Sequence, residues 1–159
     1  METLVYDIES NGFLNDVTKL HCIVTKNVDT QEVTSYYTSK GYIECMERLR
    51  EADRIIAHNQ IGYDLQVLKK LYDFQIPDIS KIFDTLVLSR LANPDRRDGH
   101  SLKAWAERAI REGFTVPPKY MIEDWSNQSL EDYLMRCTTD VEINEWVYKF
   151  LLPQVQGEG

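Results

Sequence analysis

The order of short apolar runs and amphipathic stretches is the feature of this chain that most limits its fold. Five runs have strand-like composition, and they cover residues 3–8, 20–28, 32–39, 54–59 and the start of 81–92. Helical spacing of apolar residues marks 41–52, 63–74, the rest of 81–92, 101–110 and 129–152. Adjacent strands joined by turns pair antiparallel, whereas strands joined by helices pair parallel. We therefore predict an α/β protein with a mixed five-stranded sheet, three antiparallel strands followed by two parallel ones, flanked by helices.

Length and composition are those of a single globular domain that covers residues 1–159. The chain is 43% hydrophobic with a mean hydropathy of -0.42, and no apolar run is long enough to span a bilayer. Its three cysteines are widely spaced, which argues against a disulfide framework or a zinc cluster. We expect a cytoplasmic protein with no membrane partner.

The net charge of -8 is unusual for a protein that binds nucleic acid, because such proteins usually carry a basic surface. The charge is unevenly distributed, however, and residues 81–119 contain more basic than acidic residues. An acidic cleft can still accept phosphates if divalent cations occupy it. The charge alone therefore does not exclude a nucleic-acid substrate.

Four carboxylates occur at the ends of predicted elements or near a buried helix face. Asp7 and Glu9 end the first strand, and the two-residue period of a strand directs both side chains to one side. Asp64 lies where the fourth strand gives way to a helix, and Asp140 lies within the last helix. Clustered carboxylates without a basic partner are typical ligands of hard divalent cations. Two such ions about 3.5–4 Å apart clamp the attacking and leaving oxygens of a phosphodiester.

Each of these residues also has a purely structural interpretation. Asp84 precedes a helix and is predicted to be its N-cap rather than a ligand. Asp64 is equally suited to capping its own helix, and His58 and Asn59 to satisfying main-chain groups in a turn. Asp140 has the alternatives of a solvated helix residue or an ion pair with Arg136, four positions earlier. The pair formed by Asp7 and Glu9 has no evident folding role.

Four ordered motifs resemble the DEDD superfamily of 3′–5′ exonucleases, and in particular the proofreading domain of family A DNA polymerases of podovirus-type phages. They are YDIESNGF (6–13), IIAHNQIGYDLQVL (55–68), IFDTLVLSRL (82–91) with GHSLKAWAERA (99–109), and CTTDVEIN (137–144). The resemblance implies an RNase H-like fold. It also implies a metal-dependent hydrolase that releases nucleoside monophosphates from the 3′ end of DNA.

The resemblance also implies roles for individual residues. Two Mg²⁺ or Mn²⁺ ions are expected at Asp7, Glu9, Asp64 and Asp140. Six residues are expected to lie near the terminal nucleotide, namely Ile8, Ser10, Asn11, Phe13, His58 and Asn59. Among them Phe13 is expected to stack on the 3′-terminal base.

The third motif departs from the family pattern at one catalytic position. A tyrosine four residues before the last acid normally orients the attacking water, and here that position is Arg136. The sister subfamily has a histidine five residues before the acid, and here that residue is Met135. Arg136 is therefore a candidate catalytic residue that could bind the water or a phosphate oxygen. It could equally pair with Asp140 and weaken metal binding.

Three questions about activity and partners stay open on the sequence. The protein is expected to act on single-stranded or frayed 3′ ends of DNA, with RNA as an alternative substrate. A weakly active or inactive module that binds nucleic acid or another protein is a further alternative because of Arg136. The chain is interpreted as a stand-alone exonuclease or as part of a polymerase, and a polymerase subunit is a candidate partner.

Overall fold

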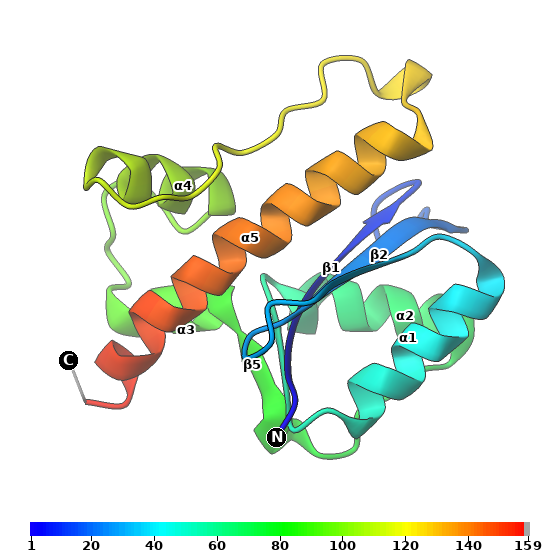
Figure 1. Ribbon diagram of the computed structural model, residues 1–159, viewed down its shortest axis with the longest axis horizontal. Helices are drawn as coiled ribbons and strands as arrows, with labels where there is room; N and C mark the ends of the chain where they lie inside the picture. The colour runs from blue at the N-terminus through cyan, green and yellow to red at the C-terminus, as the bar shows by residue number, and fades with distance from the viewer. Residues whose placement is uncertain (158–159) are drawn as a thin grey trace.

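The computed structural model describes residues 1–157 and contains one five-stranded sheet (Figure 1). The strands are β1 (Thr3–Ser10), β2 (Leu20–Asn27), β3 (Val33–Tyr36), β4 (Arg54–Ala57) and β5 (Ile82–Asp84). Their order across the sheet is β3-β2-β1-β4-β5. β1, β2 and β3 pair antiparallel, whereas β4 pairs parallel with both β1 and β5. The predicted mixed sheet is therefore confirmed, including the direction of each strand.

Five α-helices flank the sheet in two layers (Figure 1). They are α1 (Ser39–Glu51), α2 (Leu65–Tyr72), α3 (Thr85–Ala92), α4 (Leu102–Arg111) and α5 (Leu130–Val155). A π-helical turn, η1 (Gln60–Asp64), precedes α2, and short 3-10 turns occur at η2 (Ile79–Lys81) and η3 (Trp125–Asn127). Helices α1 and α2 pack on one face of the sheet, and α3 to α5 pack on the other. Within residues 1–157, we find no helix that combines the length and apolar character needed to cross a bilayer.

Helix boundaries differ from the prediction in three places. The Thr38 hydroxyl accepts a hydrogen bond from the Gly41 amide, so α1 begins at Ser39 and the preceding strand ends at Tyr36. The segment predicted as helix over 63–74 starts with the π turn. Helix α5 has its N-cap at Ser129, with Asp132 completing a capping box, and it continues beyond the predicted end at 152, past Pro153, to Val155.

The alternation of side chains along β1 explains why the first two acids face a helix. Leu4, Tyr6 and Ile8 belong to the core on the α1 and α2 side of the sheet. Val5 belongs to the second core, beneath α5. Asp7 and Glu9 continue the row of Val5 because side chains two residues apart share a face. The pairing register with β2 shifts only after Glu9, so both acids remain on the α5 side.

Candidate active site

A cleft of about 1070 Å³ opens where β1 and β4 end. Parallel strands bring their carboxyl ends to the same edge of a sheet, which gathers residues from distant parts of the sequence. Helix α5 crosses this edge and closes one side of the cleft. All the residues singled out from the sequence line it: Asp7, Ile8, Glu9, Ser10, Asn11, Phe13, His58, Asn59, Asp64, Arg136 and Asp140.

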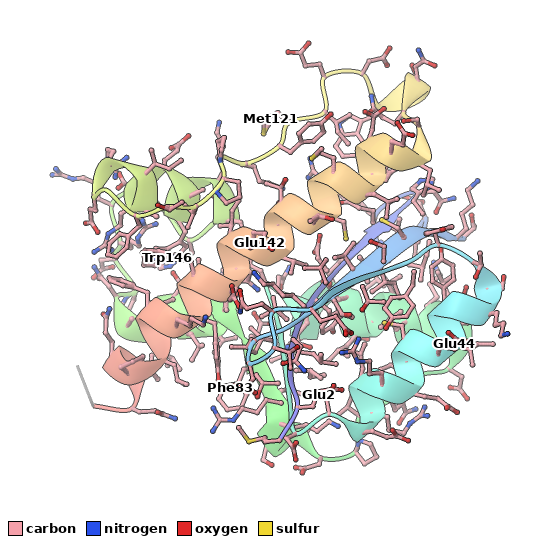
Figure 2. The ribbon with its side chains drawn as sticks, viewed as in Figure 1. Glu2, Glu44, Phe83, Met121, Glu142 and Trp146 are labelled. Carbon is pink, nitrogen blue, oxygen red and sulfur yellow. The ribbon has the colours of Figure 1, made fainter. Side chains whose placement is uncertain are left out.

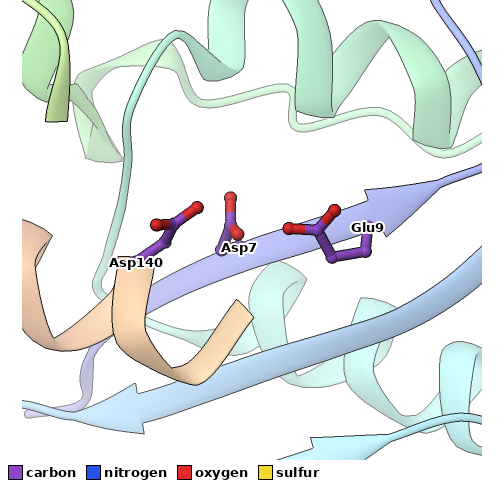
Figure 3. Close-up of side chains that lie close together, drawn as sticks. All are labelled: Asp7, Glu9 and Asp140. Carbon is purple, nitrogen blue, oxygen red and sulfur yellow. The ribbon is translucent and has the colours of Figure 1, made fainter. Parts of the chain in front are cut away.

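Three carboxylates converge at the floor of the cleft. Asp7 lies between Glu9 and Asp140, with the first two on β1 and the third on α5 (Figure 3). One oxygen from each of these three groups lies within 4.8 Å of the other two. Cys137, one turn before Asp140, donates from Sγ to the main-chain oxygen of Asp7 at 3.1 Å and so ties α5 to β1. The row of β1 side chains facing α5 produces this convergence, which includes three of the four acids expected to bind metal.

Asp64 lines the same cleft but lies outside the group of three. It ends the π turn η1, is 3% exposed, and makes no side-chain hydrogen bond to cap α2. Its Oδ2, like Oδ2 of Asp7, is buried without a hydrogen-bond partner. The alternative of a helix cap therefore does not hold, and Asp64 has an oxygen available to a ligand.

Two side-chain cations contact the acids. Nζ of Lys119 lies 2.7 and 2.8 Å from the two carboxylate oxygens of Asp140. Nε of Arg136 donates to Oε1 of Glu9 at 3.1 Å, and its guanidinium carbon lies 4.8 Å from the centre of the Trp125 ring. The suggested pairing of Arg136 with Asp140 is therefore wrong. Lys119 already occupies both oxygens of Asp140, and Arg136 reaches Glu9 instead.

Burial and mutual repulsion raise the pKa values of the acids. The pKa of Asp7 lies well above its usual value, first because the group is buried and then because Asp140, Asp64 and Glu9 surround it. Burial raises the pKa of Glu9 to about 7, although Arg136 opposes the shift. The pKa of Asp140 is also raised by burial, against the effect of Lys119. Placing positive charge here would relieve this repulsion.

The loop after β1 forms one wall of the cleft. The hydroxyls of Ser10 and Tyr63 are hydrogen-bonded, and Tyr63 also donates to the main-chain oxygen of Gly12 at 2.7 Å. The Asn11 side chain holds the loop together: its Nδ2 donates to Thr18 Oγ1, and its Oδ1 accepts from the main-chain amide of Thr18. Phe13 stands on the rim with 83% of its surface exposed. Its ring is therefore free to contact a ligand, whereas the Asn11 side chain is already engaged.

A buried hydrogen-bonded group supports the opposite wall. Asp84 accepts from the amides of Asn59, Ile61 and Leu86, which confirms it as the N-cap of α3. Thr85 donates to Asn144 Oδ1 at 2.6 Å, and its Oγ1 lies 3.0 Å from Nδ1 of His58. Burial lowers the pKa of His58 to about 4, so this imidazole is neutral at pH 7. These contacts fix the exit of β4 relative to α3 and α5.

Asn59 occupies the left-handed region at φ 62°, and Gly62 follows close by. A Cβ on Gly62 would lie 2.6 Å from Oδ1 of Asn59. A side chain at position 62 would therefore require the Asn59 side-chain amide to move. The Ile8 side chain lies in the core on the far face of the sheet, which leaves its main chain as the part available to a ligand.

Sequence reasoning missed three contributors to the cleft. Lys119 lies in the irregular segment between α4 and α5, where no periodicity indicates which side a residue faces. Trp125, from the same segment, is 52% exposed at the cleft. His21, on β2, lines the cleft and stacks on Tyr133 with ring centres 3.9 Å apart.

Comparison with known proteins finds sequence relatives among phage DNA polymerases. The DNA-directed DNA polymerase of Escherichia phage T7 is 34% identical over 131 residues, a match that covers 66% of this chain and 18% of the polymerase. The chain resembles the DEDD 3′–5′ exonucleases. This chain spans less than a fifth of the length of the T7 polymerase. No protein-family model matches the chain.

Solved structures show the same fold at low sequence identity. Escherichia coli RNase D, described as an exoribonuclease involved in structured RNA processing, superposes with a TM-score of 0.67 at 16% identity. That match covers 98% of this chain and 40% of RNase D. The family B DNA polymerase of Pyrobaculum calidifontis gives a TM-score of 0.65 at 14% identity over 96% of this chain and 25% of the polymerase. The fold is RNase H-like, as the motif resemblance to the DEDD exonucleases implied.

The acids have the chemistry needed to bind a divalent cation, which the resemblance to DEDD exonucleases implies. Their donor set consists of oxygens only, which suits Mg²⁺ or Mn²⁺. The unpartnered oxygens of Asp7 and Asp64 are free to coordinate. Arg136 contacts only Oε1 of Glu9, whereas Lys119 contacts both oxygens of Asp140.

Proposed function

We propose that the protein is a metal-dependent 3′–5′ exonuclease that hydrolyses DNA and releases nucleoside monophosphates. The observation that carries this proposal is the convergence of Asp7, Glu9 and Asp140 in a cleft whose other walls come from the remaining family motifs. The sequence similarity to a phage DNA polymerase favours DNA over other phosphodiesters.

In this proposal the residues of the cleft divide the work. Asp7, Glu9, Asp64 and Asp140 would hold two divalent cations. Such ions generate a nucleophile from water at neutral pH and stabilise charge on the oxygens of a phosphodiester. The exposed ring of Phe13 is placed to stack on a terminal base of any sequence. The loop after β1 would block the DNA from extending past its 3′-terminal nucleotide.

Asp7→Asn tests the proposed function with little change in shape. The substrate is a 5′-labelled single-stranded DNA oligonucleotide incubated with Mg²⁺, Mn²⁺ or EDTA. We expect the wild type to shorten it from the 3′ end in either metal and not in EDTA. Losing a shared metal ligand should lower the rate at least ~10³-fold. Asp16→Asn is the control, because Asp16 is exposed outside the group of acids. Hydrolysis by the Asp7 variant at the wild-type rate would reject the site.

A nucleic-acid-binding module with little or no turnover is the second candidate. It is favoured by the ion pairs of Arg136 and Lys119, which neutralise two of the acids, and by the missing motif tyrosine. Arg136→Tyr and Arg136→Met separate the two effects. Both variants free Glu9, but only the tyrosine supplies a hydroxyl. If Arg136 limits an otherwise intact site, both variants should cleave DNA faster, and the tyrosine variant should be the faster one. A fully active wild type would reject the binding module.

The choice between DNA and RNA is open to a direct competition. The T7 relative is a DNA-directed DNA polymerase, whereas RNase D is described as an exoribonuclease. We propose DNA as the preferred substrate and a DNA polymerase as the partner that the domain serves. Equal amounts of DNA and RNA of one sequence, with different labels, should show faster loss of the DNA. Faster loss of the RNA would reverse the assignment, because discrimination depends on contacts to the 2′-hydroxyl.

A further inference from the structure

Lys119 is the one basic side chain whose ammonium contacts both oxygens of a site carboxylate among residues 1–157. Its side chain is 14% exposed and that of Asp140 is 8% exposed, so this pair is largely shielded from solvent. An ammonium at 2.7 Å takes the position in which a cation would approach Asp140. Lys119 therefore competes with any metal ion for this carboxylate.

The segment that carries Lys119 has few main-chain hydrogen bonds. It comprises residues 112–129, which connect α4 to α5, and we call it the connecting segment. Met121 marks it in Figure 2, where it runs beside the N-terminal half of α5. Within the described part of the chain, residues 115–123 make no main-chain hydrogen bond to main-chain atoms of one another or of the rest of the protein. Side chains hold the segment instead: Ile122 is buried in the core beneath α5, and Tyr120 donates to Oδ1 of Asp132. Because few main-chain bonds would have to break, a local rearrangement around Lys119 has a low cost.

The charge balance of the cleft indicates what the Lys119 ammonium would bind once divalent ions are present. Two divalent ions would by themselves balance the four carboxylates of Asp7, Glu9, Asp64 and Asp140. Lys119 would then be a surplus positive charge in a shielded cleft, within a few ångströms of a metal ion that repels it. The anion that enters the cleft with a substrate is a phosphate, and lysine binds phosphate as a point charge.

We propose that Lys119 is a substrate-binding residue that exchanges Asp140 for a phosphate of the substrate when divalent ions enter the cleft. This inference rests on the proposed function and adds a residue to it. In the metal-free protein Lys119 holds Asp140 in place as a tethered counter-ion. In the loaded protein it neutralises the terminal nucleotide's phosphate.

Lys119→Met should shift two affinities in opposite directions. Binding of Mn²⁺ alone, followed by the electron paramagnetic resonance of the free ion, should tighten ~10-fold because a competing charge is gone. Binding of thymidine 5′-monophosphate in saturating Mn²⁺, followed by calorimetry, should weaken ~10-fold because a charged hydrogen bond is lost. Thymidine, which has no phosphate, should bind both proteins equally. A residue that only stabilises the fold would not move the two affinities apart.

Two variants control for charge and for folding. Lys149→Met removes an α5 lysine that pairs with Glu145, and it should leave both affinities within ~2-fold. Lys119→Arg keeps the charge and should stay close to the wild type in Mn²⁺ binding. Unchanged or weaker Mn²⁺ binding by Lys119→Met, or unchanged nucleotide binding, would overturn the inference. Neither measurement requires turnover. An inactive wild type that shows both shifts would reject the exonuclease and retain the role of Lys119.

Discussion

Asp7 shows at the scale of one residue how a functional group opposes folding. It continues a buried row of β1, lies among three other carboxylates, and has one oxygen without a hydrogen-bond partner. A carboxylate in such surroundings is unstable in its charged form. The metal-binding role that we propose for Asp7 and its cost to the metal-free fold have the same origin.

Asp7→Asn should therefore stabilise the metal-free protein at neutral and higher pH. The folded-state pKa of Asp7 is raised above the ordinary value of 3.8, so the folded state binds this proton more tightly than the unfolded state. The stability that this group contributes is fully present below pH 3.8 and is lost as the pH rises through the folded pKa. An amide removes this loss. A gain of ~1 kcal/mol would raise the melting temperature by about 2–4 °C.

The measurement is a thermal melt in EDTA at pH 4 and at pH 8. The gain should be near zero at the lower pH and clear at the higher one. Adding Mn²⁺ at pH 8 should stabilise the wild type and not the variant. If the variant melts below the wild type in EDTA at pH 8, the buried charge of Asp7 does not destabilise the metal-free protein. Asp16→Asn should be neutral throughout, because that residue is exposed.

At the scale of elements, one buried hydroxyl joins three segments around the cleft. Thr85 starts α3, contacts His58 after β4, and donates to Asn144 on α5. Thr85→Val has nearly the same shape but leaves both polar partners unsatisfied. We expect a loss of about 1–3 kcal/mol in the free energy of unfolding, measured in urea with an unchanged m-value.

Thr115→Val is the matched control for that experiment, because Thr115 is exposed in the connecting segment. It should change the free energy of unfolding by less than ~0.5 kcal/mol. If the two variants were equally stable, the contacts of Thr85 with His58 and Asn144 would contribute nothing measurable.

The elements also show what a sequence alone can supply. The composition and order of the apolar runs predicted the sheet, and the two-residue period of a strand predicted that Asp7 and Glu9 share one side of β1, because strand periodicity is local. The cap at Asp84 was predictable for the same reason. The position of Lys119 was not, since its contact with Asp140 crosses 21 residues of irregular chain and helix. Helical spacing left Asp140 open as one possible partner of Arg136, and that alternative is wrong because Lys119 already contacts both oxygens of Asp140.

At the scale of the molecule, two apolar cores lie on opposite faces of one thin sheet. Leu49 of α1 is fully buried in the first core. Trp105 lies in the second core and Trp146 packs against it, with Trp146 beside α4 in Figure 2. Adjacent β1 residues such as Leu4 and Val5 serve different cores. We propose that residues 1–159 unfold as one cooperative domain.

Leu49→Ala tests that proposal because it damages one core while tryptophan fluorescence reports mainly on the other. Truncating a buried leucine should cost about 2–5 kcal/mol. The transitions followed by fluorescence and by far-ultraviolet circular dichroism should shift together and coincide. Ile43→Ala on the same helix is the control, because Ile43 is 55% exposed. A fluorescence transition that stays at its wild-type position would show two independent units.

The antiparallel pairing of β1 with β2 places the β2–β3 turn at the opposite end of the sheet from the acids. Leu4 pairs with Asn27 at that far end, whereas Glu9 pairs with Cys22 next to the cleft. The β1–β2 loop is bound to α2 by Lys70, which donates to the main-chain oxygens of Leu14 and Asn15. Lengthening the chain between β1 and β2 would therefore disturb the cleft. The β2–β3 turn is therefore a place where extra sequence could be inserted without disturbing the cleft.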